Sequence, residues 1–126
     1  MVSLPLQTGV GTASPLAVAG TAALFALFLT LTAHLAARNV LGDVPIRNAF
    51  LVGPLPAGIA VVAAALELPS IPALLVALVV DALLIRYVYD LDRRLTAGVT
   101  LIHAVVSIIL GAIVFSLYVL VLSAPG

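Results

Sequence analysis

The sequence predicts an all-α integral membrane protein, a four-helix bundle of transmembrane helices joined by short loops. Of its 126 residues, 64% are apolar and only 8% are charged, and the mean hydropathy is +1.37. Soluble domains have about 25% charged residues and about 45–50% apolar residues, so a soluble monomer of this size would expose too much apolar surface. Long apolar runs separated by charged or Pro-containing segments predict the spans. We expect one transmembrane domain over residues 1–126.

The apolar runs give the expected bounds of the helices, which are 15–37, 49–68, 71–89 and 97–122. Ser14 followed by Pro15 is typical of an N-cap and a first helical position. A helix over the first run would be roughly 34 Å long, enough to cross a hydrocarbon core of about 30 Å. The segment GPLPAG at 53–58 predicts kinked or partly unwound first turns in the second span. Ordinary helix punctuation or a broken helix lining a binding site would both explain it.

Charge and residue usage exclude several classes of protein. The five Arg and five acidic residues balance, and Lys is absent, so there is no basic surface for nucleic acid. Cys is absent, which excludes disulfides, thiolate metal sites and iron–sulfur clusters. There is no Walker or dinucleotide-binding motif and no arguable Ser/His/Asp set. We therefore expect no enzymatic activity and no cofactor.

The arginines predict the orientation of the chain in the cell membrane. All of them lie in or beside the first and third connections: Arg38, Arg47, Arg86, Arg93 and Arg94. By the positive-inside rule these connections are cytoplasmic and both termini are outside. We expect Arg86 to extend to the inner surface, and its spacing also favours an ion pair with Asp90 at i+4.

Small residues recur on one face of each expected helix. The second span carries Gly53, Ala57, Ala60 and Ala64, and the fourth carries Gly111. In lipid, small residues let helix backbones approach closely. We expect these stripes to converge in a compact bundle with its polar atoms inward. The partners are then the lipid bilayer and either further copies of the chain or another membrane protein.

Asp81 and His103 are the titratable residues that stand out, because the expected third and fourth helices place them at a similar membrane depth. These helices form a hairpin, so the carboxylate and imidazole can meet. The contact would be a structural hydrogen bond or a proton or ion site. His34, near the inner end of the first helix, is a third candidate. The three residues have the composition of a two-His-one-carboxylate site, but their spacing carries no motif and we predict no metal.

The segments 38–43 (RNVLGD), 45–50 (PIRNAF) and 90–94 (DLDRR) resemble an uncharacterised family of small four-span membrane proteins from haloarchaea. The lysine-free, Ala/Val/Leu-rich composition is similar, although the loops lack the acidic excess usual in halophile proteins. The resemblance implies a multipass membrane protein of unknown function and no catalytic residue. A structural or accessory membrane subunit is the favoured interpretation. The alternative is a small proton- or ion-coupled transporter using Asp81 and His103.

Overall fold

The computed structural model describes residues 14–125, and every regular element in that range is an α-helix. The elements are α1 (Pro15–Leu41), α2 (Ile46–Val52), α3 (Pro54–Ala65), α4 (Ser70–Tyr89) and α5 (Arg93–Ser123). Four helical stretches in this range are long and apolar enough to cross a membrane. They are α1, the α2–α3 pair taken as one span, α4, and α5. The predicted all-α fold with four candidate spans is confirmed. The amino terminus, which we expect to lie outside the cell, precedes the residues that the structure describes.

The predicted bounds of three helices differ from the observed ones by three or four residues, because apolarity marks the membrane span while hydrogen bonds and caps mark the helix. α1 continues past residue 37 to Leu41, where the Gly42 N–H donates to the Arg38 carbonyl at 3.0 Å. The second span starts earlier and ends at Ala65, not at residue 68. α5 starts at Arg93 rather than 97, because the Asp92 carboxylate caps it by accepting from the Leu95 N–H at 2.8 Å.

The second span is interrupted at Gly53, between α2 and α3. Pro54 and Pro56 have no N–H to donate, so the carbonyls four residues before them, in the preceding turn, lose their helical hydrogen bonds. Gly53 is also where the span meets α1 most closely. A Cβ built on it would lie 2.5 Å from the Thr30 N atom and 2.6 Å from the Thr30 Cα atom. The glycine is therefore required by the close approach of two backbones.

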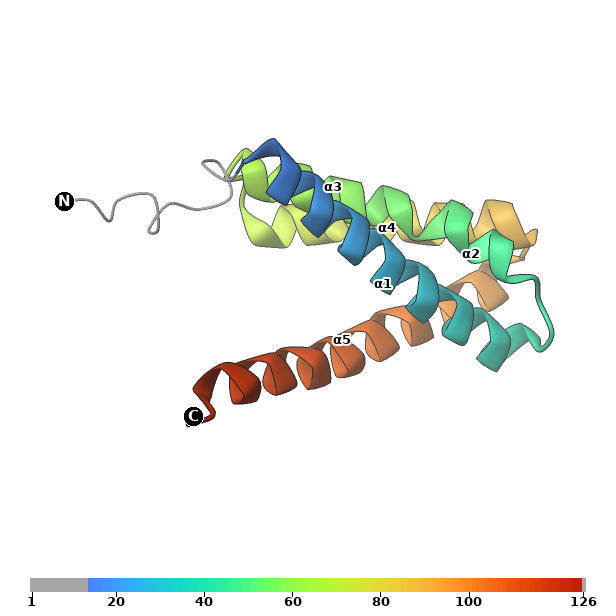
Figure 1. Cartoon of the computed structure of the whole chain (residues 1–126). Coiled ribbons are helices and arrows are strands. Elements are labelled where there is room, and N and C mark those ends of the chain that lie inside the picture. Colours follow the sequence, from blue (N-terminus) through green and yellow to red (C-terminus); the bar gives the residue numbers. More distant parts are fainter. Residues whose placement is uncertain (1–13, 126) are drawn as a thin grey trace.

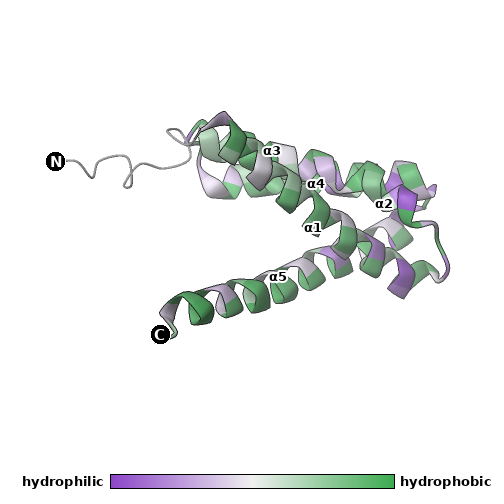
Figure 2. Ribbon diagram, in the orientation of Figure 1, coloured by the Kyte–Doolittle hydropathy of each residue, from purple (hydrophilic) through white to green (hydrophobic). Residues whose placement is uncertain are grey.

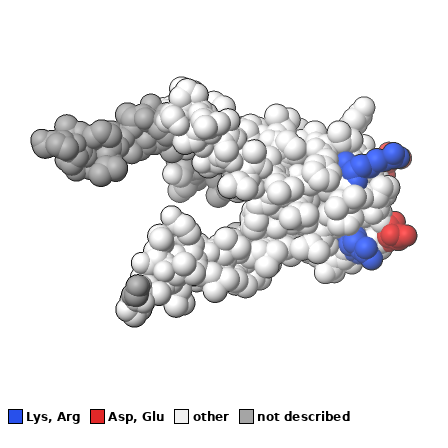
Figure 3. Space-filling view, viewed as in Figure 1, with Lys and Arg blue, Asp and Glu red and all other residues white. Residues whose placement is uncertain are grey.

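The packed core lies at one end of the molecule. It consists of seven fully or almost fully buried residues: Ala33, Ala36, Ala37, Ala49, Val52, Ile85 and Val99. Figure 1 shows the α1–α2 connection and the α4–α5 turn together at this end. The hydrophilic residues gather there in Figure 2, and the visible Arg and acidic side chains, coloured blue and red, do so in Figure 3. The predicted grouping of the charged connections at one end is confirmed.

The bundle is open at its other end, because α5 diverges from the other helices (Figure 1). The buried residues of α5 are Thr96, Val99 and His103, and no residue from 104 to 125 is buried. The expectation of a bundle that is compact along its whole length was therefore wrong. Apolar side chains gain no hydrophobic energy by leaving lipid for a helix, so a helix needs small or polar contacts to stay packed.

Candidate functional site

Asp81 and His103 form a buried pair between α4 and α5. The Asp81 Oδ2 atom lies 2.6 Å from the His103 Nδ1 atom, and the two side chains are 7% and 4% exposed. This is the only ion pair or carboxylate–imidazole contact among residues 14–125. The sequence allowed the two side chains to meet without deciding whether they touch, and the structure places them in contact. Their role, structural or proton-carrying, is a separate question.

α1 completes the site through its backbone and a hydroxyl. The His103 Nε2 atom lies 3.0 Å from the Thr32 Oγ1 atom and 3.2 Å from the Leu29 carbonyl oxygen. Ser107, one turn after His103, donates to the Thr32 Oγ1 atom at 2.9 Å. Thr32 in turn donates to the Leu29 carbonyl at 3.1 Å. The network therefore ties three helices together where α5 begins to diverge.

The hydrogen-bond partners assign the protons of the network. The only hydrogen of the Thr32 hydroxyl goes to the Leu29 carbonyl, so Thr32 Oγ1 accepts from Ser107 and from His103. The Leu29 carbonyl can also only accept. His103 Nε2 must then carry a hydrogen. One further proton lies between Nδ1 and Asp81 Oδ2, and either distribution of it leaves the pair with no net charge. A pair without net charge suits a low-dielectric site.

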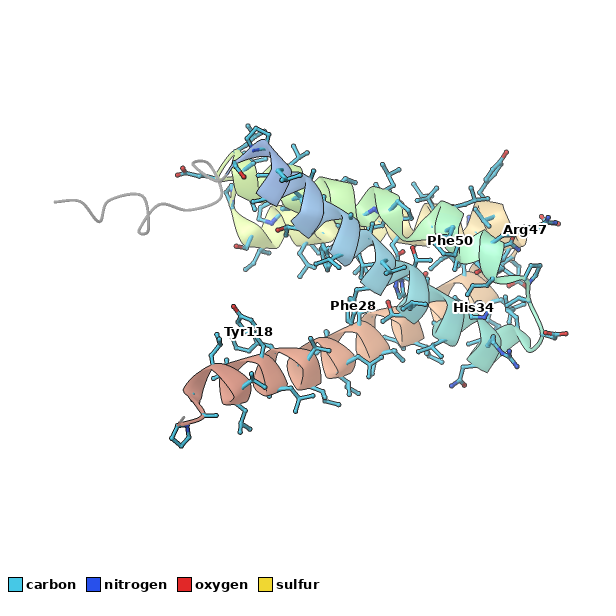
Figure 4. The ribbon with its side chains drawn as sticks, viewed as in Figure 1. Phe28, His34, Arg47, Phe50 and Tyr118 are labelled. Carbon is cyan, nitrogen blue, oxygen red and sulfur yellow. The ribbon has the colours of Figure 1, made fainter. Side chains whose placement is uncertain are left out.

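The pair lines a hollow of about 600 Å³ enclosed by α1, α3, α4 and α5. We call it the inner hollow, and its wall includes Phe28, Ala60, Ala64, Ala77 and Gly111. The space-filling view shows the opening between the diverging α5 and the rest of the molecule (Figure 3). In Figure 4, Phe28 from α1 and Tyr118 from α5 project into the gap between these helices. Asp81 Oδ1 is buried with no hydrogen-bond partner.

The other site candidates do not join this network. His34 is half-buried, and its Nδ1 atom is buried without a hydrogen-bond partner. Residues 14–125 contain no group of three His, Cys, Asp or Glu side chains that could hold a metal ion. The expected ion pair between Arg86 and Asp90 is absent from the described residues, because Asp90 ends α4 in the left-handed conformation with φ 54°. That backbone turn changes the i+4 geometry.

The predicted packing residues of the second span are only partly buried. Gly53 and Ala57 are buried and Ala60 is half-buried, but Ala64 is exposed and Ala63 is buried in its place. Gly53 keeps a right-handed helical backbone with φ −64° and ψ −43°, so the residue count continues through it, and after Ala60 the packed face passes to Ala63 at i+3 rather than to Ala64 at i+4. Gly111 faces α1, since a Cβ built on it would lie 3.8 Å from the Phe28 Cζ atom.

Sequence reasoning missed Thr32, which is 1% exposed. Counting 100° per residue along the first helix places Thr30 and His34, and not Thr32, on its face of small and polar residues. Thr30 donates to the Ala26 carbonyl of its own helix at 2.7 Å and does not reach the network. The available signal was a further hydroxyl between Thr30 and His34, two residues from each.

Comparison with known proteins gives a family but no role. A family of unknown function, DUF7473, matches residues 12–125. No curated protein and no solved structure matches the chain.

Proposed function

We propose that this chain, which belongs to the family of unknown function DUF7473, is a structural or accessory subunit of the cell membrane with no enzymatic role. The observation that carries the proposal is the inner hollow beside an α5 whose residues 104–123 have no buried side chain. Both surfaces are apolar and unfilled within one chain. A haloarchaeal origin, which the resemblance to haloarchaeal membrane proteins implies, is part of the same proposal.

The proposed occupant of the hollow is α5 of a second copy of this chain. The wall is rich in small residues, Ala60, Ala64, Ala77 and Gly111 among them, and such surfaces accept a helix closely in lipid. α5 is 31 residues long and carries no charged residue after Arg94, so its distal half can enter an apolar hollow. Because each copy has both the helix and the hollow, a two-fold dimer would fill two hollows at once.

Enlarging a wall residue should block this assembly. Ala64→Leu, or Ala60→Leu, places a larger side chain inside the hollow and leaves less space for a helix. Overfilling a packed contact costs about 1–3 kcal/mol. We expect the dimer fraction to fall about tenfold, measured by mass in detergent and in nanodiscs. Ala23→Leu, on an exposed part of α1 outside the hollow, is the control and should leave the dimer intact. A wild-type chain that is strictly monomeric in both environments would rule out the second copy as occupant.

The orientation of the chain gives a second test. The charged connections at one end of the molecule support a cytoplasmic location for that end. The chain has no Cys, so an introduced Cys is the only thiol. In intact cells an impermeant maleimide should label Ser123→Cys and not Asp92→Cys, and permeabilisation should expose both. Labelling of Asp92→Cys from outside would reverse the topology.

A second candidate function is proton- or ion-coupled transport. The specific support is the network of Ser107, Thr32, His103 and Asp81, which adjoins the inner hollow and holds a proton between carboxylate and imidazole. Intramembrane carboxylates commonly mark such pathways. In this candidate Asp81 would give up and regain the proton as the hollow changes its exposure. We rank it second because the network also has a purely structural role, joining α5 to α1 and α4.

A further inference from the structure

A groove of about 510 Å³ lies between α4 and α5 and adjoins the inner hollow, with which it shares Leu78 and Ala104. We call it the α4–α5 groove. Its walls are apolar along most of their length and include Leu78, Val79, Leu101 and Ala104. At the charged end of the molecule, Arg86 from the last turn of α4 and Arg93 from the first turn of α5 line the same groove. The groove therefore has a cationic mouth and an apolar body.

The two guanidinium groups at the mouth are not neutralised by the described part of the chain. Both arginines are exposed, and the only ion pair among residues 14–125 is the one between Asp81 and His103. The acids nearest in sequence are Asp90 and Asp92 in the turn between the helices. Asp92 accepts a hydrogen bond from the Leu95 N–H as the N-cap of α5, and neither acid forms an ion pair with Arg86 or Arg93. The mouth therefore favours an anion.

The dimensions of the groove favour a lipid over a free anion. Ala104 follows Arg93 by 11 residues of α5, which corresponds to about 16 Å of helix. One leaflet of the hydrocarbon core is about 15 Å deep, half of the roughly 30 Å total. The apolar part of the groove thus matches the length of one acyl chain in one leaflet. A free phosphate would use the mouth and leave the rest of the groove uncovered.

We propose that the α4–α5 groove binds one anionic phospholipid. Arg86 and Arg93 bind its phosphate, since guanidinium groups form paired, charge-assisted hydrogen bonds with phosphate oxygens. One acyl chain lies along the groove against Val79, Leu101 and Ala104. An anionic headgroup is preferred over a zwitterionic one, because the choline or amine of a zwitterionic headgroup would place a second positive charge beside the two arginines.

Retention of lipid by the purified full chain tests this site. Native mass spectrometry in detergent, with added phosphatidylglycerol or phosphatidylcholine, should show preferential retention of one phosphatidylglycerol by the wild type. The double variant Arg86→Gln/Arg93→Gln should reduce that retention about tenfold, since each charge-assisted bond contributes substantially. Arg38→Gln/Arg47→Gln removes the same charge from the same end of the molecule, outside the groove, and should change retention less than about twofold.

Two further arms separate the lipid from its headgroup. Ala82→Leu, in the wall of the groove and not in that of the inner hollow, narrows the apolar body without changing the arginines and should also weaken phosphatidylglycerol retention. Inorganic phosphate at the same concentration should give no thermal stabilisation of the wild type. Circular dichroism checks that each variant keeps its helix content. Equal losses in the two arginine pairs, equal retention of the two lipids, unchanged retention in Ala82→Leu or stabilisation by phosphate alone would each overturn the proposal.

Discussion

Gly53→Ala is expected to destabilise the chain by about 3 kcal/mol or more, although it adds a single methyl group. The added Cβ would lie 2.5 Å from the Thr30 N atom and 2.6 Å from the Thr30 Cα atom, and it would also clash with the Thr30 hydroxyl oxygen. Two of these three atoms belong to the backbone of α1, so no side-chain rotation relieves the clash. α1 and the α2–α3 junction would have to separate, and the core at the charged end depends on their contact.

Gly58→Ala and Gly98→Ala are the matched controls. Both glycines are helical, and a Cβ at either position meets nothing within 4 Å. Alanine is the better helix former, so these variants should be neutral or stabilised by up to about 1 kcal/mol. Thermal and denaturant unfolding in the same detergent, followed by circular dichroism, compares the three. If Gly53→Ala unfolds within error of the controls, the backbone contact with Thr30 is not as close as described.

The membrane fold could be predicted because composition and run length depend on the solvent and not on the partners of each helix. Gly53 was also predicted as a packing residue, from its place in a small-residue stripe. Which backbone it approaches could not be predicted, because the spacing on one helix contains no information about the neighbouring helix. The burial of Ala63 instead of Ala64 could not be predicted for the same reason, since both residues lie beside the small-residue face and the position of the neighbouring helix decides between them.

The site was only partly predictable for a similar reason. Depth along two helices of a hairpin can be counted from the sequence, and that count brought Asp81 and His103 together. Thr32 could not be chosen over Thr30, because a hydroxyl in a membrane helix can bond to its own backbone, as Thr30 does, or to another helix. The divergence of α5 could not be predicted either, because the same apolar residue types face lipid and neighbouring helices.

Asp81→Leu is expected to lower stability by about 2 kcal/mol, near the upper end of measured effects for polar contacts between membrane helices. It removes the 2.6 Å contact and leaves the buried Nδ1 atom of His103 without a partner. Asp81→Asn should cost much less, because the amide N–H can donate to Nδ1 while Nε2 still donates to Thr32. His103→Leu should cost at least as much as Asp81→Leu, since it breaks the bonds to α1 as well.

The double variant Asp81→Leu/His103→Leu shows whether the residues act as a pair. If they stabilise each other, the double variant should lose less stability than the two single variants lose together. Neither residue of the pair is then left buried without its polar partner. Strictly additive losses would contradict the pairing.

A proton-flux assay on vesicles then separates the two candidate functions. Asp81→Asn keeps the hydrogen bonds and loses the exchangeable carboxyl proton, so in a transporter it should abolish flux while stability stays near wild type. In a structural subunit the wild type itself carries no flux. The variants then differ only in stability, with Asp81→Asn more stable than Asp81→Leu.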